Sequence, residues 1–111
     1  MNIQIFGIKG FETQKAERYF KERKINYQYI DLIKYGLSKG EFDSVKVAVG
    51  IKDLINMNSK DYIKLNMQNL GVGKVAEEAL FKNPKLYNSP IVRNGRKATV
   101  GHQPDIWKYW E

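Results

Sequence analysis

The chain has 111 residues, no cysteine and one histidine, and its 19 Lys and Arg against 12 Asp and Glu give a formal net charge of +7. This length suits a single domain with one core, and the lack of cysteine excludes disulfides, thiol redox chemistry and thiolate metal sites. We find no apolar leader segment and no run of about 18 apolar residues, so we expect a cytoplasmic protein with no metal and no membrane contact.

The chain begins with a predicted strand, turn and helix. Apolar and polar residues alternate over 2–5, which is the period of a strand. A glycine-bounded turn follows over 7–10, and we expect a helix to begin near Glu12 or Thr13. The apolar face of this helix has the i, i+3, i+4 spacing and consists of Ala16, Tyr19 and Phe20.

A second strand is predicted over 25–31, where apolar and polar residues again alternate. A strand, a crossover helix and a second strand make a parallel βαβ unit. Next, Ser38 and Glu41 have the spacing of a capping box, which predicts a helix to about Val47. Short helices are expected over 51–55 and over 60–65, the latter capped by Ser59.

A further helix is predicted from Lys74 to Lys82, because Pro84 ends it and an apolar stripe faces inward. We assign to that stripe Val75, Ala76, Ala79 and Leu80.

An antiparallel hairpin is predicted near the end of the chain. The dipeptide Asn94-Gly95 separates strand-like runs over 90–93 and 96–100, and both of its residues tolerate positive φ, which favours a type I′ turn. Pro104 suits the first turn of a last helix. The residues expected to pack inward from it are Ile106, Trp107 and Trp110.

An ordered set of motifs accompanies these elements. The run 7–15, Gly-Ile-Lys-Gly-Phe-Glu-Thr-Gln-Lys, resembles the Gly-Ile-x-Asn-Cys-Asp-Thr-x-Lys opening of the arsenate reductase (ArsC) family, which includes the Spx regulators. Further matches follow in family order, namely Ile30-Asp31, 34–38, 54–56 with Tyr62, Leu65-Asn66, Asn83-Pro84, 89–92 with Asn94-Gly95, Val100-Gly101, and Pro104 with Trp107. Together these motifs are specific for the fold of that family.

The resemblance implies an α/β fold of the thioredoxin type, ArsC-like, in one domain over 1–111. Its four-stranded mixed sheet combines the βαβ unit with the C-terminal β-hairpin and helix, and a helical insertion occupies about 38–82. The resemblance also implies a cis bond before Pro90, which would face the turn that precedes the first helix.

The same resemblance implies a site that has lost its catalysis. Phe11 stands where the family has its catalytic cysteine, and the arginine positions that hold the oxyanion correspond to Ser89 and Asn56. We therefore assign no catalytic residue, and expect Phe11 to plug the vacated pocket near Pro90. A weak anion site stays possible at the helix N-terminus, where N–H groups and Lys9 are positive. The vestigial pocket would comprise Lys9, Gly10, Phe11, Glu12, Thr13, Asn56, Ser59, Ser89 and Pro90.

Two functions of different classes follow from these residues. The first is a degenerate, inactive family member that binds a protein partner without a cofactor; the Spx branch acts on the C-terminal domain of the α-subunit of RNA polymerase, which makes RNA polymerase a candidate. Tyr19, Arg23, Tyr27 or Trp110 would suit such an interface, although their spacing also fits ordinary packing. The alternative is a reductase or transferase that takes its thiol from glutathione or a partner protein.

Two further activities have less support in the residues. Basic nucleic-acid binding is not expected, because acidic residues interrupt the basic clusters. An enzyme with another nucleophile would need Thr13, Ser59 or Ser89 beside a general base, and His102 is the only histidine.

Overall fold

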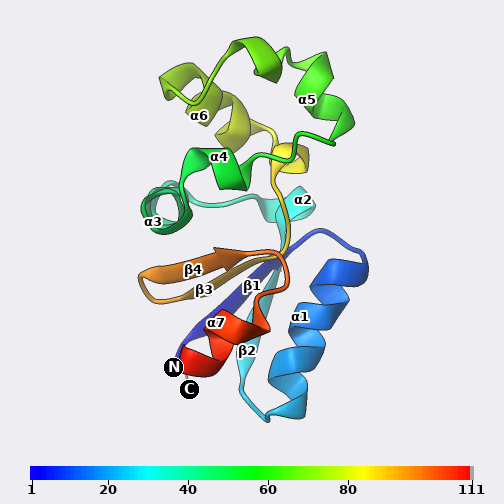
Figure 1. The fold of residues 1–111 in the computed structure, drawn as a ribbon, viewed down its shortest axis with the longest axis vertical. Helices are drawn as coiled ribbons and strands as arrows, with labels where there is room; N and C mark the ends of the chain where they lie inside the picture. The colour runs from blue at the N-terminus through cyan, green and yellow to red at the C-terminus, as the bar shows by residue number, and fades with distance from the viewer. Residues whose placement is uncertain (111) are drawn as a thin grey trace.

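A computed structural model describes residues 1–110, and a four-stranded sheet lies between two sets of helices (Figure 1). The strands are β1 (Ile3–Gly7), β2 (Tyr27–Asp31), β3 (Ile91–Asn94) and β4 (Lys97–Val100). Their order across the sheet is β2-β1-β3-β4; β1 and β2 run parallel, and β3 is antiparallel to both β1 and β4. The predicted mixed sheet, a βαβ unit plus a hairpin, is confirmed.

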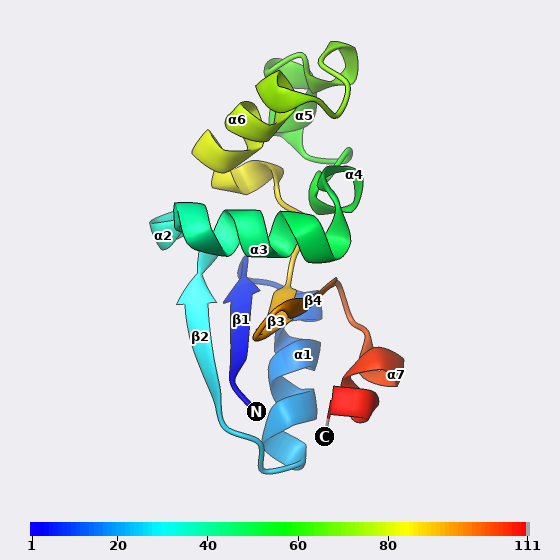
Figure 2. The ribbon, with the colours of Figure 1, turned by 90° about the vertical axis from the view of Figure 1, so that its left-hand side faces the viewer.

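The helices divide between the faces of the sheet. They are α1 (Phe11–Glu22), α2 (Leu32–Tyr35), α3 (Lys39–Val49), α4 (Ile51–Leu54), α5 (Lys60–Lys64), α6 (Lys74–Lys82) and α7 (Pro104–Trp107), with short 3-10 helices η1 (Met67–Asn69), η2 (Pro84–Leu86) and η3 (Lys108–Trp110). Helices α1 and α7 lie on one side of the sheet, while α3 lies on the other and α4–α6 continue beyond it (Figures 1 and 2). No helix within residues 1–110 is long and apolar enough to cross a membrane.

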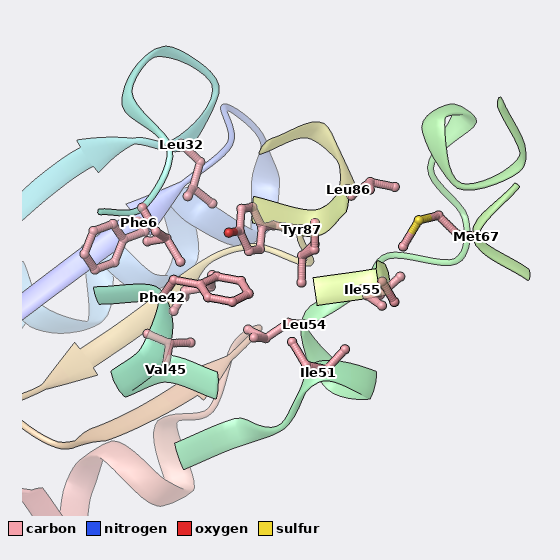
Figure 3. Packing of buried hydrophobic residues seen from close by; sticks show 14 residues of the cluster. Phe6, Leu32, Phe42, Val45, Ile51, Leu54, Ile55, Met67, Leu86 and Tyr87 are labelled. Atoms are coloured by element: carbon pink, nitrogen blue, oxygen red, sulfur yellow. The ribbon is translucent and has the colours of Figure 1, made fainter. Parts of the chain in front are cut away.

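The alternation of side chains along the strands explains this layering, since successive residues point to opposite faces. On the α1 side, Ile3, Ile5 and Val92 are buried in one cluster with Phe20 and Trp107. On the other face, a second buried cluster contains Phe6 and Ile91 from the sheet. Its helical members include Leu32, Phe42, Val45 and Leu54, which are labelled in Figure 3, and Leu80.

The second cluster also contains a polar group. Tyr87, 1% exposed, lies among Phe6, Phe42 and Leu54 in Figure 3. Its hydroxyl oxygen has no hydrogen-bond partner in the described chain, and burial raises the pKa of this phenol. The core therefore contains a neutral but unsatisfied hydroxyl.

The capping motifs in the sequence correctly predicted where helices α3 and α5 begin. The capping box at the start of α3 is formed: the Glu41 N–H donates to Ser38 Oγ at 3.2 Å, and the Ser38 N–H donates to Glu41 Oε1 at 2.8 Å. The Ser59 hydroxyl accepts the Asp61 N–H at 3.2 Å, which confirms the predicted cap of α5. Helix α6 has the predicted bounds, 74–82.

Two details of the sequence analysis are wrong. The hairpin register pairs Asn94 with Lys97, so the two loop residues are Gly95 and Arg96. Of these two loop residues, Gly95 has a positive φ, +62°, and Arg96 does not. This combination fits a type II′ turn in place of the predicted type I′ turn. Asn94 remains in the strand, where its Oδ1 accepts the Asn2 N–H at 3.3 Å.

The inward stripes of the last two predicted helices are also narrower than expected. Val75 is 62% exposed and Ile106 is 44% exposed, whereas Ala76, Leu80 and Trp107 are fully buried. Both helices pack on the outside of the core, so only the side chains that face the core are buried.

Candidate functional site

The turn between β1 and α1 is held by contacts of Gly7 and Thr13. The Thr13 hydroxyl donates to the Ile8 carbonyl at 2.7 Å, and a Cβ at Gly7 would lie 2.5 Å from Thr13 Cγ2 and 2.9 Å from Tyr29 Cε1. Glycine is therefore needed for the close approach of helix and strand. Burial, with the charges of Asp31 and Glu17, raises the pKa of Tyr29, whose hydroxyl donates to the Gly7 carbonyl at 3.4 Å.

Helix α1 begins directly after this turn without a side-chain cap. Gly10 is its N-cap residue, and the Gln14 N–H donates to the Gly10 carbonyl at 3.1 Å. Lys9 is exposed beside it. This arrangement leaves N–H groups of the first turn available, as an anion site requires. The weak anion site stays a prediction that calorimetric titration with millimolar phosphate, arsenate or sulfate would test.

Phe11 does not plug a pocket, and that expectation is wrong. The residue is 70% exposed, and the Lys15 ammonium lies 4.6 Å from its ring centroid. Thr13 faces the sheet, and a residue two positions earlier points about 200° away around a helix. Position 11 therefore faces solvent because Thr13 faces the core.

Asn56 and Ser59 connect the helical segment to the chain that precedes Pro90. The Asn56 N–H donates to the Leu86 carbonyl at 2.7 Å, and the Ser59 hydroxyl donates to the Lys85 carbonyl at 3.1 Å. The Asn56 side chain accepts the Asn58 N–H at 2.9 Å. Both predicted site residues thus have structural hydrogen bonds.

The Ser89-Pro90 bond is cis, as the resemblance implied. Pro90 is buried and Ser89 is half-buried. Just before them, the Asn88 amide donates to the carbonyls of Asp53 and Ile55 at 2.8 and 3.0 Å. The loop before β3 is therefore fastened to the end of α4.

A cleft of about 640 Å³, which we call the α4–β4 cleft, opens beside this loop. Its walls come from the ends of α3 and α4, from 55–58, from β4 and from the start of α7, and it is lined by Ala48, Val49, Lys52, Asp53, Ile55, Asn56, Met57, Asn58, Asn88, Ala98, Thr99, Val100, Gln103 and Ile106. Met57 and Ile106 are 65% and 44% exposed, so they offer apolar surface at a rim of amide side chains. Of the predicted pocket residues, only Asn56 lines this cleft.

The described residues show no arrangement for an alternative nucleophile at Thr13 or Ser59. Both hydroxyls donate to backbone carbonyls, which cannot act as a general base. His102 packs edge-on against Trp107, with ring centroids 5.5 Å apart, and lines a cleft of about 310 Å³ with Lys15 and Arg18. Within residues 1–110, no group of three or more His, Asp or Glu side chains could hold a metal ion.

Three of the four residues suggested for an interface are packed. Tyr19 is 6% exposed, and the Tyr27 hydroxyl donates to Glu17 at 3.0 Å. Trp110 packs against the cluster beneath α1. Arg23 is exposed, and its guanidinium lies 3.6 Å from the Tyr19 ring centroid.

The strand order, the helix after β1 and the cis proline at the start of β3 define a thioredoxin-like α/β protein with helices between the βαβ unit and the hairpin. Solved structures support this class. An ArsC family related protein from Bacteroides fragilis has a TM-score of 0.87 and 20% identity, covering 100% of this chain and 98% of that one. An arsenate reductase from Vibrio cholerae has a TM-score of 0.83 and 21% identity, covering 96% and 94%.

The family follows from the sequence. The ArsC family model matches residues 11–109, so the chain belongs to the ArsC family. A curated relative, the global transcriptional regulator Spx 2 of Oceanobacillus iheyensis, is 27% identical over 114 residues, which cover 98% of this chain and 84% of that protein. The recognition made from the motifs is confirmed.

The sequence analysis missed the residues of the α4–β4 cleft other than Asn56. They come from four separate segments of the chain, and short amide and apolar residues have no spacing that marks a site. Asn88 is the residue that a signal could have revealed, because it lies immediately before Ser89-Pro90.

Proposed function

We propose that this chain is an ArsC family protein that no longer reduces arsenate and that acts by binding a protein partner. The observation that carries the proposal is Phe11, a solvent-exposed aromatic residue at the position of the family cysteine, in a chain that has no cysteine at all. A phenyl ring has no nucleophilic lone pair, so it cannot attack an oxyanion. The proposed function needs no cofactor.

The other positions that the resemblance assigns to the oxyanion site support the proposed loss of catalysis. Ser89 and Asn56 replace the arginines that the family resemblance places around the oxyanion, and neither carries charge. The Asn56 side-chain oxygen already accepts a backbone N–H. Lys9 alone would provide weak, exposed electrostatic attraction.

The first partner to examine is RNA polymerase, through the C-terminal domain of its α-subunit. A relative that spans nearly the whole chain is a transcriptional regulator, and the resemblance to the Spx branch suggests this partner. The α4–β4 cleft offers a surface of suitable character, since exposed apolar anchors among polar groups are typical of interface centres. Such a partner would place the protein in the cytoplasm.

The enzymatic part is tested by an arsenate reductase assay with the glutathione, glutaredoxin and thioredoxin systems supplied in turn. We expect no turnover by the natural protein with any of them. Phe11→Cys is expected to gain a reactive thiol but no sustained turnover, because the arginine positions stay uncharged. Turnover by the natural protein with glutathione would instead support the alternative, a reductase that borrows its thiol.

The binding part is tested by titration with that polymerase domain in purified form, with Ile106→Asp as the test variant and Ile33→Asp as its control. Ile106 and Ile33 are 44% and 42% exposed, but only Ile106 lines the cleft. We expect Ile106→Asp to weaken binding at least about tenfold and Ile33→Asp less than about twofold. Absence of binding at high micromolar protein, or equal effects of the two variants, would refute this choice of partner or of surface.

A further inference from the structure

We propose that a groove between α3 and α6 binds an acidic peptide segment of a partner, with an apolar side chain seated between its acidic residues. We call this the α3–α6 groove. It is lined by Lys39, Phe42, Lys46, Lys74, Glu77, Glu78, Phe81 and Lys82. Helix α6 lies beyond α3 on the side away from the sheet, so the groove is remote from the turn at Phe11 (Figures 1 and 2).

Helical periodicity gathers these side chains into two facing rows. Positions 39, 42 and 46 of α3 have the spacing of one helix face, and so do positions 74, 77, 78, 81 and 82 of α6. The volume between the rows is about 650 Å³. At a rise of about 1.5 Å per residue, the rows extend for roughly 10 and 12 Å, which is the length of about two helical turns.

Two phenylalanines form the floor of the groove. The rings of Phe42 and Phe81 pack edge to face with centroids 5.3 Å apart. Phe42 is 2% exposed and belongs to the core, whereas Phe81 is only partly buried. The Lys39 ammonium lies 5.6 Å and 6.0 Å from the two ring centroids, so positive charge stands directly beside the apolar floor.

The charges of the lining are unbalanced. Lys46 Nζ is 2.8 Å from Glu77 Oε1, and the hydrogen bond to Glu77 raises the pKa of Lys46 although burial opposes it. This pair joins the two helices and neutralises one carboxylate. Lys39, Lys74 and Lys82 then face the single carboxylate of Glu78, while Asp43, outside the groove, lies 3.1 Å from Lys39 Nζ and 3.9 Å from Lys46 Nζ; the four lysines still exceed the three carboxylates by one charge. The groove therefore attracts anions.

The pattern favours a peptide over a nucleic acid. A nucleic-acid strand carries phosphates at regular, close spacing, and some of them would lie against Glu77 and Glu78. A peptide can place carboxylates opposite Lys39, Lys82 and Lys74, an apolar side chain on Phe81, and uncharged residues opposite the glutamates. An amphipathic helix of two to three turns meets these requirements, which is a known way of filling a groove.

The inference rests on the proposed function in one respect, since it assumes that the chain acts by binding proteins. Its surface is separate, because the α3–α6 groove and the α4–β4 cleft share no lining residue. Lys82→Glu is expected to leave binding of the RNA polymerase domain unchanged. Failure of either proposal can therefore be recognised without the other.

The test is fluorescence anisotropy with a labelled peptide of about twelve residues, about three turns of helix. The peptide carries Phe at its centre and Glu about one turn to each side. One control peptide replaces the central Phe by Ser, and another replaces each Glu by Lys. The protein variants are Lys39→Glu and Lys82→Glu in the groove and Lys64→Glu on α5, an exposed lysine outside it. Far-UV circular dichroism confirms that each variant is folded.

We expect the acidic peptide to bind with a Kd of tens of micromolar at low salt. Each groove variant, and each control peptide, should weaken binding at least about tenfold, while Lys64→Glu should change it less than about twofold. No saturable binding below about 1 mM would overturn the proposal. So would an equal effect of Lys64→Glu, or unchanged binding of the peptide without Phe, because either result would mean non-specific attraction by the net charge.

Discussion

Replacing Phe11 by alanine should destabilise the protein far less than the same change at Phe20 on the same helix. Phe11 is 70% exposed and Phe20 fully buried. A phenylalanine buries about 200 Å² when fully enclosed, so Phe11 buries roughly 60 Å², worth about 1.5 kcal/mol at about 25 cal/mol per Å². The better helix propensity of alanine offsets about 0.5 kcal/mol. We expect a loss near 1 kcal/mol for Phe11→Ala and about 3–5 kcal/mol for Phe20→Ala.

Urea unfolding followed by far-UV circular dichroism measures both values, because backbone signal is little affected by loss of one aromatic ring. Equal slopes against urea for the natural protein and the variants would show that the unfolded states are comparable. If Phe11→Ala loses as much stability as Phe20→Ala, then Phe11 packs in the protein core, and the assignment of position 11 to the surface is wrong.

Three other changes have expected outcomes. Thr99→Val should lower the free energy of unfolding by about 1–3 kcal/mol, measured with urea, because the buried Trp107 Nε1–H loses its acceptor, Thr99 Oγ1 at 2.8 Å. Thr99→Ser keeps a hydroxyl at this position and should retain most of the stability. Burial and the hydrogen bond to Glu17 raise the pKa of Tyr27 from 10.0 to about 12. As the pH rises, the unfolded chain therefore loses the Tyr27 proton before the folded protein does. The contribution of Tyr27 to the free energy of unfolding is complete below pH 10 and falls as the pH rises toward 12. Between pH 10 and about 12, the urea midpoint should fall less steeply with pH in Tyr27→Phe than in the natural protein. An equal dependence of the midpoint on pH in the two proteins would contradict the raised pKa of Tyr27. Tyr87→Phe should raise the free energy of unfolding by about 1 kcal/mol, because it removes a buried hydroxyl that has no partner in residues 1–110; a loss of stability would contradict this.

Local chemistry made most of the fold predictable. The capping pair Ser38 and Glu41, the cap at Ser59 and the stop at Pro84 act within a few residues, so they could be read directly and are confirmed. The turn type failed for a different reason. Asn94 is bound by the N–H of Asn2, 92 residues away, and its pairing with Lys97 moves the loop by one residue. This tertiary contact outweighs the local preference of Asn94-Gly95 for the two central positions of a type I′ turn.

The candidate site was less predictable, because burial at position 11 depends on helix phase. The resemblance predicts that Phe11 stands at the position of the family cysteine, and a pocket-filling role for Phe11 assumed that its side chain points inward, whereas it is 70% exposed. Thr13 determines the phase through its contacts with Gly7 and Ile8. The α3–α6 groove was missed because it needs Phe42 and Phe81 to meet across two helices, 39 residues apart in sequence, and no periodicity within one helix reveals that meeting.

The structure explains how a family member can lose its nucleophile and keep its fold. The contacts that hold the turn, from Thr13 to the Ile8 carbonyl and from Tyr29 to the Gly7 carbonyl, do not involve the side chain at position 11. Asn88 and Asn56 fasten the loop before Pro90 through backbone carbonyls and N–H groups. Because neither set needs a thiol or an arginine, the chain keeps the fold of the ArsC family although it has no cysteine. Under the proposed function, exposed surfaces such as the α4–β4 cleft provide partner binding on a framework that does not depend on the oxyanion site.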